Sequence, residues 1–361
     1  MKTTSRENIT VTKINAANKR GVGNSCITTK GLLPKMTNKT RITIKDVAKA
    51  ANVTPQTVSR AMRNAPDISP ETRDRILAIA SELNYVKNST ATALRSGATR
   101  LIAVVFDNLR NVYFSIMADY IQFCLKERGY TMLTLSQRKG SLDRESYLTA
   151  ISHNVDGIIT FVEPEECIVS LIGEYKVPVL LFGRKTDVSG VDYVYTDDVK
   201  GGRLAAKKLL ESGCKKILMI SEVMSLTCAF DRYDGFKAVL EENGITPELL
   251  IRSGLDNEEF GEKIKELKGD KYPDGIFCFN DMIAFETLFY IEKYNLPKVK
   301  IVGYDNIQEE IKIPQRLTSI GTDKPGLCDE AVSLIIERIE KNSGGIKSKK
   351  ADVFIAEGAT V

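Results

Sequence analysis

In the stretch Thr43–Met62, apolar residues are spaced as in two short amphipathic helices separated by a turn. Apolar residues recur at intervals of three and four from Ile44 to Ala51, which is the stripe of an amphipathic helix. Thr54 and Pro55 then start a second helix, because threonine caps a first turn and proline fits its first position. The outward-facing side chains of this second helix are polar: Gln56, Thr57, Ser59 and Arg60. The pattern predicts a helix-turn-helix, whose second helix enters the major groove of DNA.

A third helix is predicted from Pro70 to Leu83, with Ser69 as its cap and Ile76 in its apolar stripe. Three short helices of this kind can enclose a minimal core. Because the free amides at a helix N-terminus attract phosphate, Ser69 and Thr72 are candidate phosphate contacts.

From Leu101 onwards, short apolar runs alternate with helical repeats. Such runs are typical of parallel strands that are buried on both faces and linked by helices. The expected strands cover residues 101–106, 131–135, 157–162, 178–182, 216–220, 275–279 and 300–304. The expected helices cover residues 113–128, 143–152, 165–175, 199–212, 231–243, 258–268 and 281–294. A break near Tyr195–Asp198 divides this repeat into two similar doubly wound halves.

Polar or aromatic residues stand just after several of the predicted strands. In open α/β sheets a ligand binds beyond the carboxyl ends of the strands, so one cleft between the two halves would explain these positions together. They are Asn108–Phe114, Arg184, Arg232, Asn280-Asp281 and Asp305.

The net charge of +4 is unevenly distributed along the 361 residues. Residues 1–39 hold eight Lys/Arg and one acid, and residues 40–95 hold nine Lys/Arg and five acids, so the remainder is acidic. A basic front and an acidic body suit a protein that places only its front on a polyanion. Residues 1–39 lack periodicity and are expected to be disordered. They are either an extension ahead of a true start at Met36 or a basic tail that adds phosphate attraction.

Several functional classes are disfavoured by what the sequence lacks. It contains no apolar run of the roughly 18 residues that suggest a membrane span, and no signal peptide, so a cytoplasmic protein without membrane contact is expected. Seven cysteines form no CxxC pair and His153 is the only histidine, so neither a metal nor another cofactor is expected. No catalytic triad, carboxylate pair or phosphate loop stands out, which argues against an enzyme.

The run DVAKAANVTPQTVSRAM resembles the headpiece of the lactose-repressor (LacI/GalR) family of transcription regulators, and the rest of the chain is similar in order. The resemblance implies an all-α helix-turn-helix headpiece followed by an α/β core of two doubly wound parallel-sheet subdomains, as in periplasmic binding proteins. It implies a headpiece at 40–86, a hinge at 87–99 and a core at 100–361. The core would divide into 100–196 with 323–350, and 197–322 with 351–361, so that a helix at 325–341 returns to the first half and a strand at 353–356 to the second.

In the family, the positions of Pro55, Gln56 and Arg60 read base edges. Gln56 can bond adenine and Arg60 can bond guanine, each through two hydrogen bonds, while Pro55 offers only apolar contact with a thymine methyl. The alternative partner for Arg60 is a phosphate. Phosphate contacts, which position a protein without specifying a sequence, are expected from Thr54, Thr57, Ser59, Asn64, Ser69 and Thr72.

Asn88, Ala91 and Leu94 match the family's hinge pattern Asn-x-x-Ala-x-x-Leu. The match implies a helix that forms only on operator DNA, where paired Leu94 side chains wedge into the minor groove. The alternative is that Leu94 packs on the core as an ordinary linker residue. Lys87 replaces the proline that usually precedes the hinge asparagine.

The resemblance implies effector contacts at the aromatic pair Tyr113-Phe114, at Arg232 in Arg-x-x-Gly-Phe, at Asn280-Asp281 and at Asp305. Arg184 joins them through its place after a strand. Aromatic rings stack on a sugar or base, and a guanidinium fork suits vicinal hydroxyls. The alternatives are that Phe114 belongs to the core, that Asn280-Asp281 caps a helix and that Asp305 caps a loop.

Four sites depart from the family's usual residues, so no effector can be copied from a relative: Asp197-Asp198, Gly183-Arg184, Gly213-Cys214 and Asn306. We expect a transcription regulator of the repressor type that binds a pseudo-palindromic operator as a homodimer, under the control of a small, sugar-like effector. The alternative is a periplasmic-type binding protein without a DNA role, and an enzyme is a weaker third.

Overall fold

The computed structural model describes residues 42–86, 97–137, 140–252, 255–313, 316–341 and 344–361. The chain divides into two compact units, Met1–Lys87 and Asn88–Val361, which are described separately below as the headpiece and the core. Among the described helices, none is both long and apolar enough to span a bilayer.

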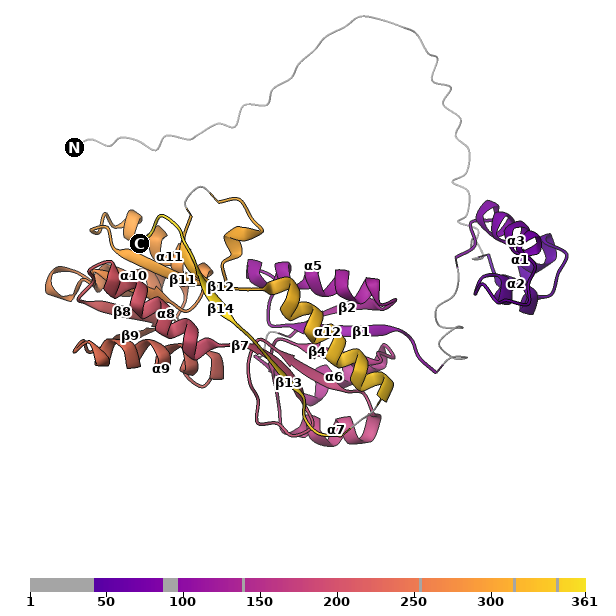
Figure 1. Ribbon diagram of the computed structural model, residues 1–361, viewed down its shortest axis with the longest axis horizontal. Helices are drawn as coiled ribbons and strands as arrows, with labels where there is room; N and C mark the ends of the chain where they lie inside the picture. The colour runs from indigo at the N-terminus through magenta and orange to yellow at the C-terminus, as the bar shows by residue number, and fades with distance from the viewer. Residues whose placement is uncertain (1–41, 87–96, 138–139, 253–254, 314–315, 342–343) are drawn as a thin grey trace, which may run out of the picture. The chain divides into compact units, whose positions relative to one another are not determined.

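The described part of the headpiece, residues 42–86, contains three helices, α1 (Ile44–Ala50), α2 (Pro55–Ala61) and α3 (Pro70–Glu82) (Figure 1). Thr43 and Asp46 form the reciprocal capping box that starts α1. The apolar stripes of the three helices meet in a small core of Val47, Ala48, Ala51, Val58, Ala61, Ile76 and Ala80. With so few apolar residues, caps and turns contribute a substantial share of the headpiece's stability.

The first subdomain of the core is a six-stranded parallel sheet in the order β13-β7-β6-β4-β1-β2. Its strands are β1 (Leu101–Phe106), β2 (Thr131–Ser136), β4 (Gly157–Thr160), β6 (Val179–Phe182), β7 (Asp192–Thr196) and β13 (Ser348–Ala351). The short strands β3 (Ser141–Leu142) and β5 (Glu163–Pro164) pair separately. The helices are α5 (Val112–Glu127), α6 (Arg144–Ser152), α7 (Cys167–Tyr175) and α12 (Lys324–Lys341), and α12 lies against α5 (Figure 1).

The second subdomain is a six-stranded sheet in the order β14-β12-β11-β10-β8-β9. Its strands are β8 (Ile217–Ser221), β9 (Glu248–Ile251), β10 (Gly275–Cys278), β11 (Lys300–Tyr304), β12 (Thr318–Thr322) and the antiparallel β14 (Val353–Ala356). The helices are α8 (Asp198–Glu211), α9 (Thr227–Glu242), α10 (Asn257–Glu266) and α11 (Asp281–Lys293), with short turns η1 (Gly269–Lys271) and η2 (Ile307–Glu309).

The chain passes between the two sheets after β7, after β12 and after β13, and the three crossovers are bonded to one another. The amide of Asp197 donates to the carbonyl of Ala351 at 2.9 Å, and Lys350 Nζ donates to the Asp197 carboxylate at 2.7 Å. Thr322 Oγ1 donates to the carbonyl of Asp352 at 2.8 Å. The three crossovers between the subdomains therefore form one hydrogen-bonded unit rather than three independent linkers.

Helices α8 and α9 approach so closely that glycine is required on both. A Cβ on Gly202 would lie 2.0 Å from the carbonyl oxygen of Arg232, and one on Gly235 would lie 2.0 Å from that of Val199. This backbone-to-backbone contact sets the position of Arg232 relative to the start of α8.

Gly202→Ala is expected to lower the free energy of unfolding of the core by about 1–3 kcal/mol, because the added methyl group must push the two helices apart. The shift in the midpoint of urea unfolding measures the effect. Gly173→Ala on α7 is the matched control, since nothing lies within 4 Å of its Cβ position. Equal effects of the two substitutions would contradict the close contact.

Candidate functional site

The start of α2 is fixed by its own capping chemistry. Thr54 Oγ1 accepts the amide of Thr57 at 3.1 Å, and the hydroxyls of the two residues lie 2.9 Å apart. Pro55 occupies the first helical position and is exposed, whereas Val58 is buried. The helix therefore turns its polar side away from the headpiece core.

The exposed face of α2 carries donors suited to base edges. Gln56 is exposed, and Ser59 and Arg60 are partly exposed. The guanidinium of Arg60 is not free, because it forms an ion pair with Asp67 in the loop that follows. Sequence reasoning identified Arg60 but gave no sign of this partner.

The expected phosphate contacts of the headpiece also lie around the start of α3. Ser69 Oγ accepts the amide of Thr72 at 3.3 Å, and Asn64 adopts a left-handed conformation, with φ of 57°, in the preceding loop. Both sites are at the surface. The hinge residues Asn88, Ala91 and Leu94 lie outside the described residues.

In the core, Arg232 is the centre of a buried polar cluster in the second subdomain. Its side chain comes from α9, where it is 6% exposed. Its Nε donates to Asp198 Oδ1 at 2.8 Å, and its Nη1 donates to the carbonyl of Phe279 at 2.6 Å. Its Cζ lies 3.5 Å from the ring centroid of Tyr304 and 4.4 Å from that of Phe279. Ion pairing, hydrogen bonding and cation–π contact together offset the cost of burying the charge.

The Arg232 cluster carries its own counter-ion. Burial alone would lower the pKa of Arg232, but the charge of Asp198 raises that pKa above its ordinary value. Asp198 also accepts a hydrogen bond from Thr196 Oγ1 at 3.1 Å. Arg232 Nη2 makes no hydrogen bond among the described residues, so this edge remains available to a ligand that needs a donor rather than a free positive charge.

Asp305 contributes a carboxylate that has no hydrogen-bond partner among the described residues. It follows β11 with a left-handed φ of 98°, a strained conformation of the kind found at functional sites. Burial raises its pKa to about 8, although the charge of Arg232 opposes the shift. Burial, and then the charge of Asp305, also raises the pKa of Tyr113 on α5. Tyr113 therefore lies within electrostatic range of Asp305, although α5 belongs to the first subdomain and β11 to the second.

The side chains of Asn280 and Asp281 both make hydrogen bonds within the second subdomain. Asn280 Oδ1 caps α11 by accepting the amide of Ile283 at 2.9 Å. Asp281 is 1% exposed, and its two oxygens accept the Ser319 hydroxyl at 2.6 Å and the Ile307 amide at 2.9 Å. Asp281 therefore holds η2 and β12, and its direct contact with an effector stays a prediction.

The two remaining predicted residues differ in their surroundings. Phe114 packs in the first subdomain, with its ring 5.6 Å from that of Phe161, so its alternative role as a core residue is present. Arg184 Nη2 donates to the carbonyl of Phe161 at 3.0 Å, while its Nε is buried with no partner among the described residues. Burial raises the pKa of the Cys228 thiol, and the charges of Arg184 and Arg232 oppose this rise.

A pocket of about 790 Å³ opens between the two subdomains beside this cluster. Arg110 and Asn111 line it from the first subdomain. The second subdomain contributes Glu222, Arg252, Asn257, Asn280, Met282, Ile283, Phe285 and Glu286. The pocket is lined by one of the residues that the resemblance assigns to the effector, Asn280, which directly follows Phe279 of the Arg232 cluster. Tyr113, Arg232 and Asp305 are not among the described residues that line it. Glu222 and Arg252 are among the pocket residues that sequence reasoning missed; both follow strands, which is the signal that could have identified them.

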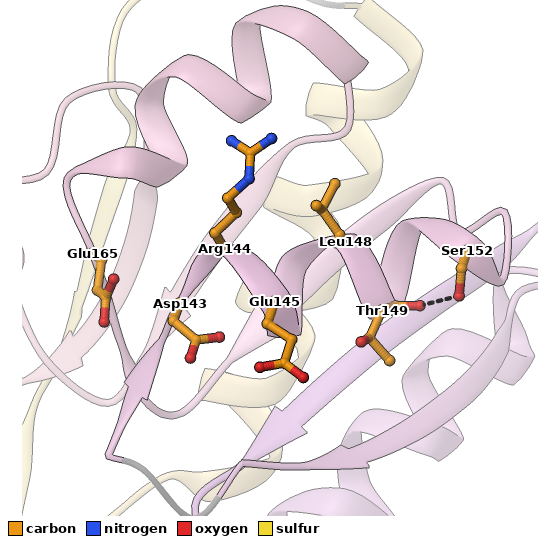
Figure 2. A pocket seen from close by; sticks show the side chains of 7 residues that line it. All are labelled: Asp143, Arg144, Glu145, Leu148, Thr149, Ser152 and Glu165. Carbon is orange, nitrogen blue, oxygen red and sulfur yellow. Dashed lines mark hydrogen bonds between the residues drawn. The ribbon is translucent and has the colours of Figure 1, made fainter.

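A second hollow, of about 650 Å³, lies on the outer face of the first subdomain along α6 (Figure 2). Six of its lining residues belong to Asp143–Ser152 and the seventh is Glu165. Its side chains come from one subdomain only, so movement between the subdomains does not close it. It is a poorer candidate for a regulatory ligand than the pocket between the subdomains.

Comparisons with known proteins agree with this division into headpiece and core. Residues 43–88 match the family described as bacterial regulatory proteins, lacI family, and residues 102–323 match a periplasmic binding protein domain. The HTH-type transcriptional regulator DegA of Bacillus subtilis (strain 168) is 32% identical over 289 residues, which cover 77% of this chain and 86% of DegA. The HTH-type transcriptional repressor PurR of Aliivibrio salmonicida (strain LFI1238) is 28% identical over 309 residues, which cover 82% of this chain and 92% of PurR. The lac repressor dimer, solved with operator and the anti-inducer ONPF, has a TM-score of 0.74 at 22% identity and covers 88% of this chain and 98% of its own.

These matches define the class as a helix-turn-helix regulator with a periplasmic-binding-protein-like core. The chain belongs to the lacI family of bacterial regulatory proteins. The fold class and the family resemblance predicted from the sequence are confirmed, and its relatives are transcriptional regulators rather than enzymes.

Raising the pH is expected to destabilise the core through Asp305. Its pKa is 3.8 in an ordinary setting and about 8 when folded, so between these values the folded state holds a proton that the unfolded chain releases. Stability is therefore highest below about pH 4 for this group and falls as pH rises towards 8. The melting temperature of Asp305→Asn, measured at about pH 6 and pH 9, should fall less than that of the wild type. Equal falls in the two proteins would contradict the buried setting of Asp305.

Proposed function

We propose that this chain is a cytoplasmic repressor that binds a pseudo-palindromic operator as a homodimer, and that a small, sugar-like effector controls its affinity for the operator. The observation that carries the proposal is that one chain joins the exposed polar face of α2 to a pocket between two subdomains. The lac repressor structure of similar fold contains both an operator and a small ligand.

On the DNA side, Gln56 and Arg60 supply base recognition, with adenine and guanine as their partners. Pro55 contributes apolar contact, and the hydroxyl and amide side chains around the starts of α2 and α3 hold phosphates. One headpiece of this size reads only a few base pairs, so a two-fold dimer on two half-sites gives the necessary specificity. In this proposal Leu94 from each hinge opens the minor groove between the half-sites.

On the effector side, the groups that converge suit a neutral molecule with several hydroxyls. Below its pKa of about 8 the carboxyl group of Asp305 holds a proton, so it offers both a donor and an acceptor, while Arg184 and Arg232 offer N–H donors. Tyr113 supplies an aromatic edge from the opposite subdomain. Because Asp198 already neutralises Arg232, a ligand with a strong negative charge gains little there.

A ligand held by Asp305 would act beside a set of contacts that links the subdomains. The carbonyl of Asn306 accepts Lys324 Nζ at 2.9 Å, and this fully buried ammonium lies 3.1 Å from Glu310. Glu310 in turn accepts the hydroxyl of Tyr120 on α5 at 3.3 Å. Closure around the ligand would move α5 relative to η2 and so bias the pose of the first subdomain, which leads into the hinge. The effector changes DNA affinity only through such differential contacts.

Asp305→Ala is expected to remove the rise in melting temperature that an effector causes, while operator affinity without effector stays within about threefold of the wild type. The effector is sought by thermal-shift screening of sugars, sugar phosphates and nucleobases, since a ligand of the folded state raises the melting temperature. The operator is selected from random duplexes. Asp270→Ala, an exposed residue of η1, is the control. Failure to enrich any duplex, or an unchanged ligand response in Asp305→Ala, would contradict the proposal.

The alternative of a binding protein without a DNA role finds no support, because residues 43–88 match the DNA-binding part of the lacI family. No other feature of the described residues favours it.

A further inference from the structure

The ion pair between Arg60 and Asp67 joins the base-reading face of α2 to the loop before α3. Asp67 Oδ2 contacts the Nη2 edge of the guanidinium. Both side chains are partly open to solvent, with 42% of Arg60 and 45% of Asp67 exposed. An exposed pair of this kind is weak, so it adds little to folding and can rearrange when DNA arrives.

The loop that carries Asp67 is nevertheless held firmly. Arg73 Nη2 donates to the carbonyls of Ala65 and Ile68, both at 3.1 Å, on either side of Asp67. The amide of Ala65 also donates to the carbonyl of Arg60 at 3.1 Å. The carboxylate of Asp67 is thus kept beside Arg60 by backbone contacts that do not involve the ion pair itself.

A carboxylate in this position affects the two possible DNA partners of Arg60 differently. The guanidinium is a planar fork with five N–H donors, so one edge can remain on Asp67 while the other meets the two acceptors of guanine. A DNA phosphate, by contrast, competes with Asp67 for the charge of Arg60 and is repelled by the Asp67 carboxylate. Specificity arises when the wrong partner is penalised as well as when the right one is favoured.

We propose that Asp67 is a specificity-determining positioning residue of the headpiece. It orients Arg60 towards a base edge and weakens capture of Arg60 by the phosphate backbone. This inference rests on the proposed function, in which Arg60 reads a guanine.

Five full-length proteins test the proposal: the wild type, Asp67→Asn, Asp67→Glu, Asp74→Asn and Arg60→Ala. Asp74→Asn is the matched control, because Asp74 is an exposed acid of the same headpiece and its loss changes the net charge equally. Fluorescence anisotropy gives the Kd of each protein for a selected operator and for a scrambled duplex at several salt concentrations. Thermal unfolding checks that each variant is folded.

Asp67→Asn should bind the scrambled duplex more tightly, with a salt slope steeper by about 0.9, because Arg60 gains a phosphate. Its ratio of operator to scrambled affinity should fall by about 5- to 10-fold, part of the discrimination carried by one bidentate contact. Asp67→Glu should keep the wild-type ratio. Asp74→Asn should change both affinities by the same factor and leave the ratio unchanged.

The operator is also varied one base pair at a time. Asp67→Asn should relax discrimination at the same base pair in each half-site as Arg60→Ala does. An equal ratio in Asp67→Asn and Asp74→Asn, or relaxation at a different base pair, would overturn the role of Asp67 alone. A wild-type protein that does not distinguish the two duplexes would overturn the proposed function, and the role of Asp67 with it.

Discussion

The buried ion pair between Arg232 and Asp198 is the interaction on which the core site depends. Asp198 begins α8 directly after the first crossover, and Arg232 projects from α9, so the pair ties the crossover to the ligand-facing end of the second sheet. The glycine contact between α8 and α9 brings the two side chains within reach. Desolvating both ions costs several kcal/mol each, and loss of one partner would leave an unpaired buried charge. Arg232, which the sequence analysis assigned only to the effector, therefore also holds the first crossover between the subdomains in place.

This arrangement bears on what the Arg232 cluster could recognise. The charge of Arg232 is paired with Asp198, and the carboxyl group of Asp305 has no hydrogen-bond partner among the described residues. Below its pKa of about 8 that group holds a proton and offers both a donor and an acceptor, which is consistent with the proposed neutral ligand with several hydroxyls. On one side, Thr227 Oγ1 donates to the carbonyl of Lys185 at 3.0 Å across the subdomains, and on another Tyr120 donates to Glu310. Because such contacts bridge the two subdomains, a rotation of one subdomain against the other would have to break some of them. An effector that bound one arrangement more tightly would then shift the equilibrium towards it.

Much of the fold could be predicted from local pattern, because helix caps and buried apolar strands leave clear signatures. Strands β12 and β13 could not, since their sequences, TSIGT and SKKA, contain little apolar surface and become strands through pairing with distant segments. Strands β7 (DYVYT) and β9 (ELLI) were also missed. The residues of the candidate site likewise fall into those that local sequence indicates and those that only tertiary contacts reveal. Residues after apolar strands, such as Arg184 and Asp305, were found from position. The pairing of Arg232 with Asp198, 34 residues away in sequence, could not be predicted from residue spacing. The same holds for the hydrogen bonds that Asp281 accepts from Ser319 and Ile307.

The central claim is that the pocket between the subdomains and the headpiece share one conformational equilibrium. The most direct measurement is a thermodynamic cycle on the full-length protein: operator affinity with and without saturating effector, and effector affinity with and without operator. The same factor, of about 5- to 150-fold, is expected on both sides of the cycle, because binding coupling is reciprocal. An effector that binds the core but leaves operator affinity unchanged would show that the two do not share an equilibrium.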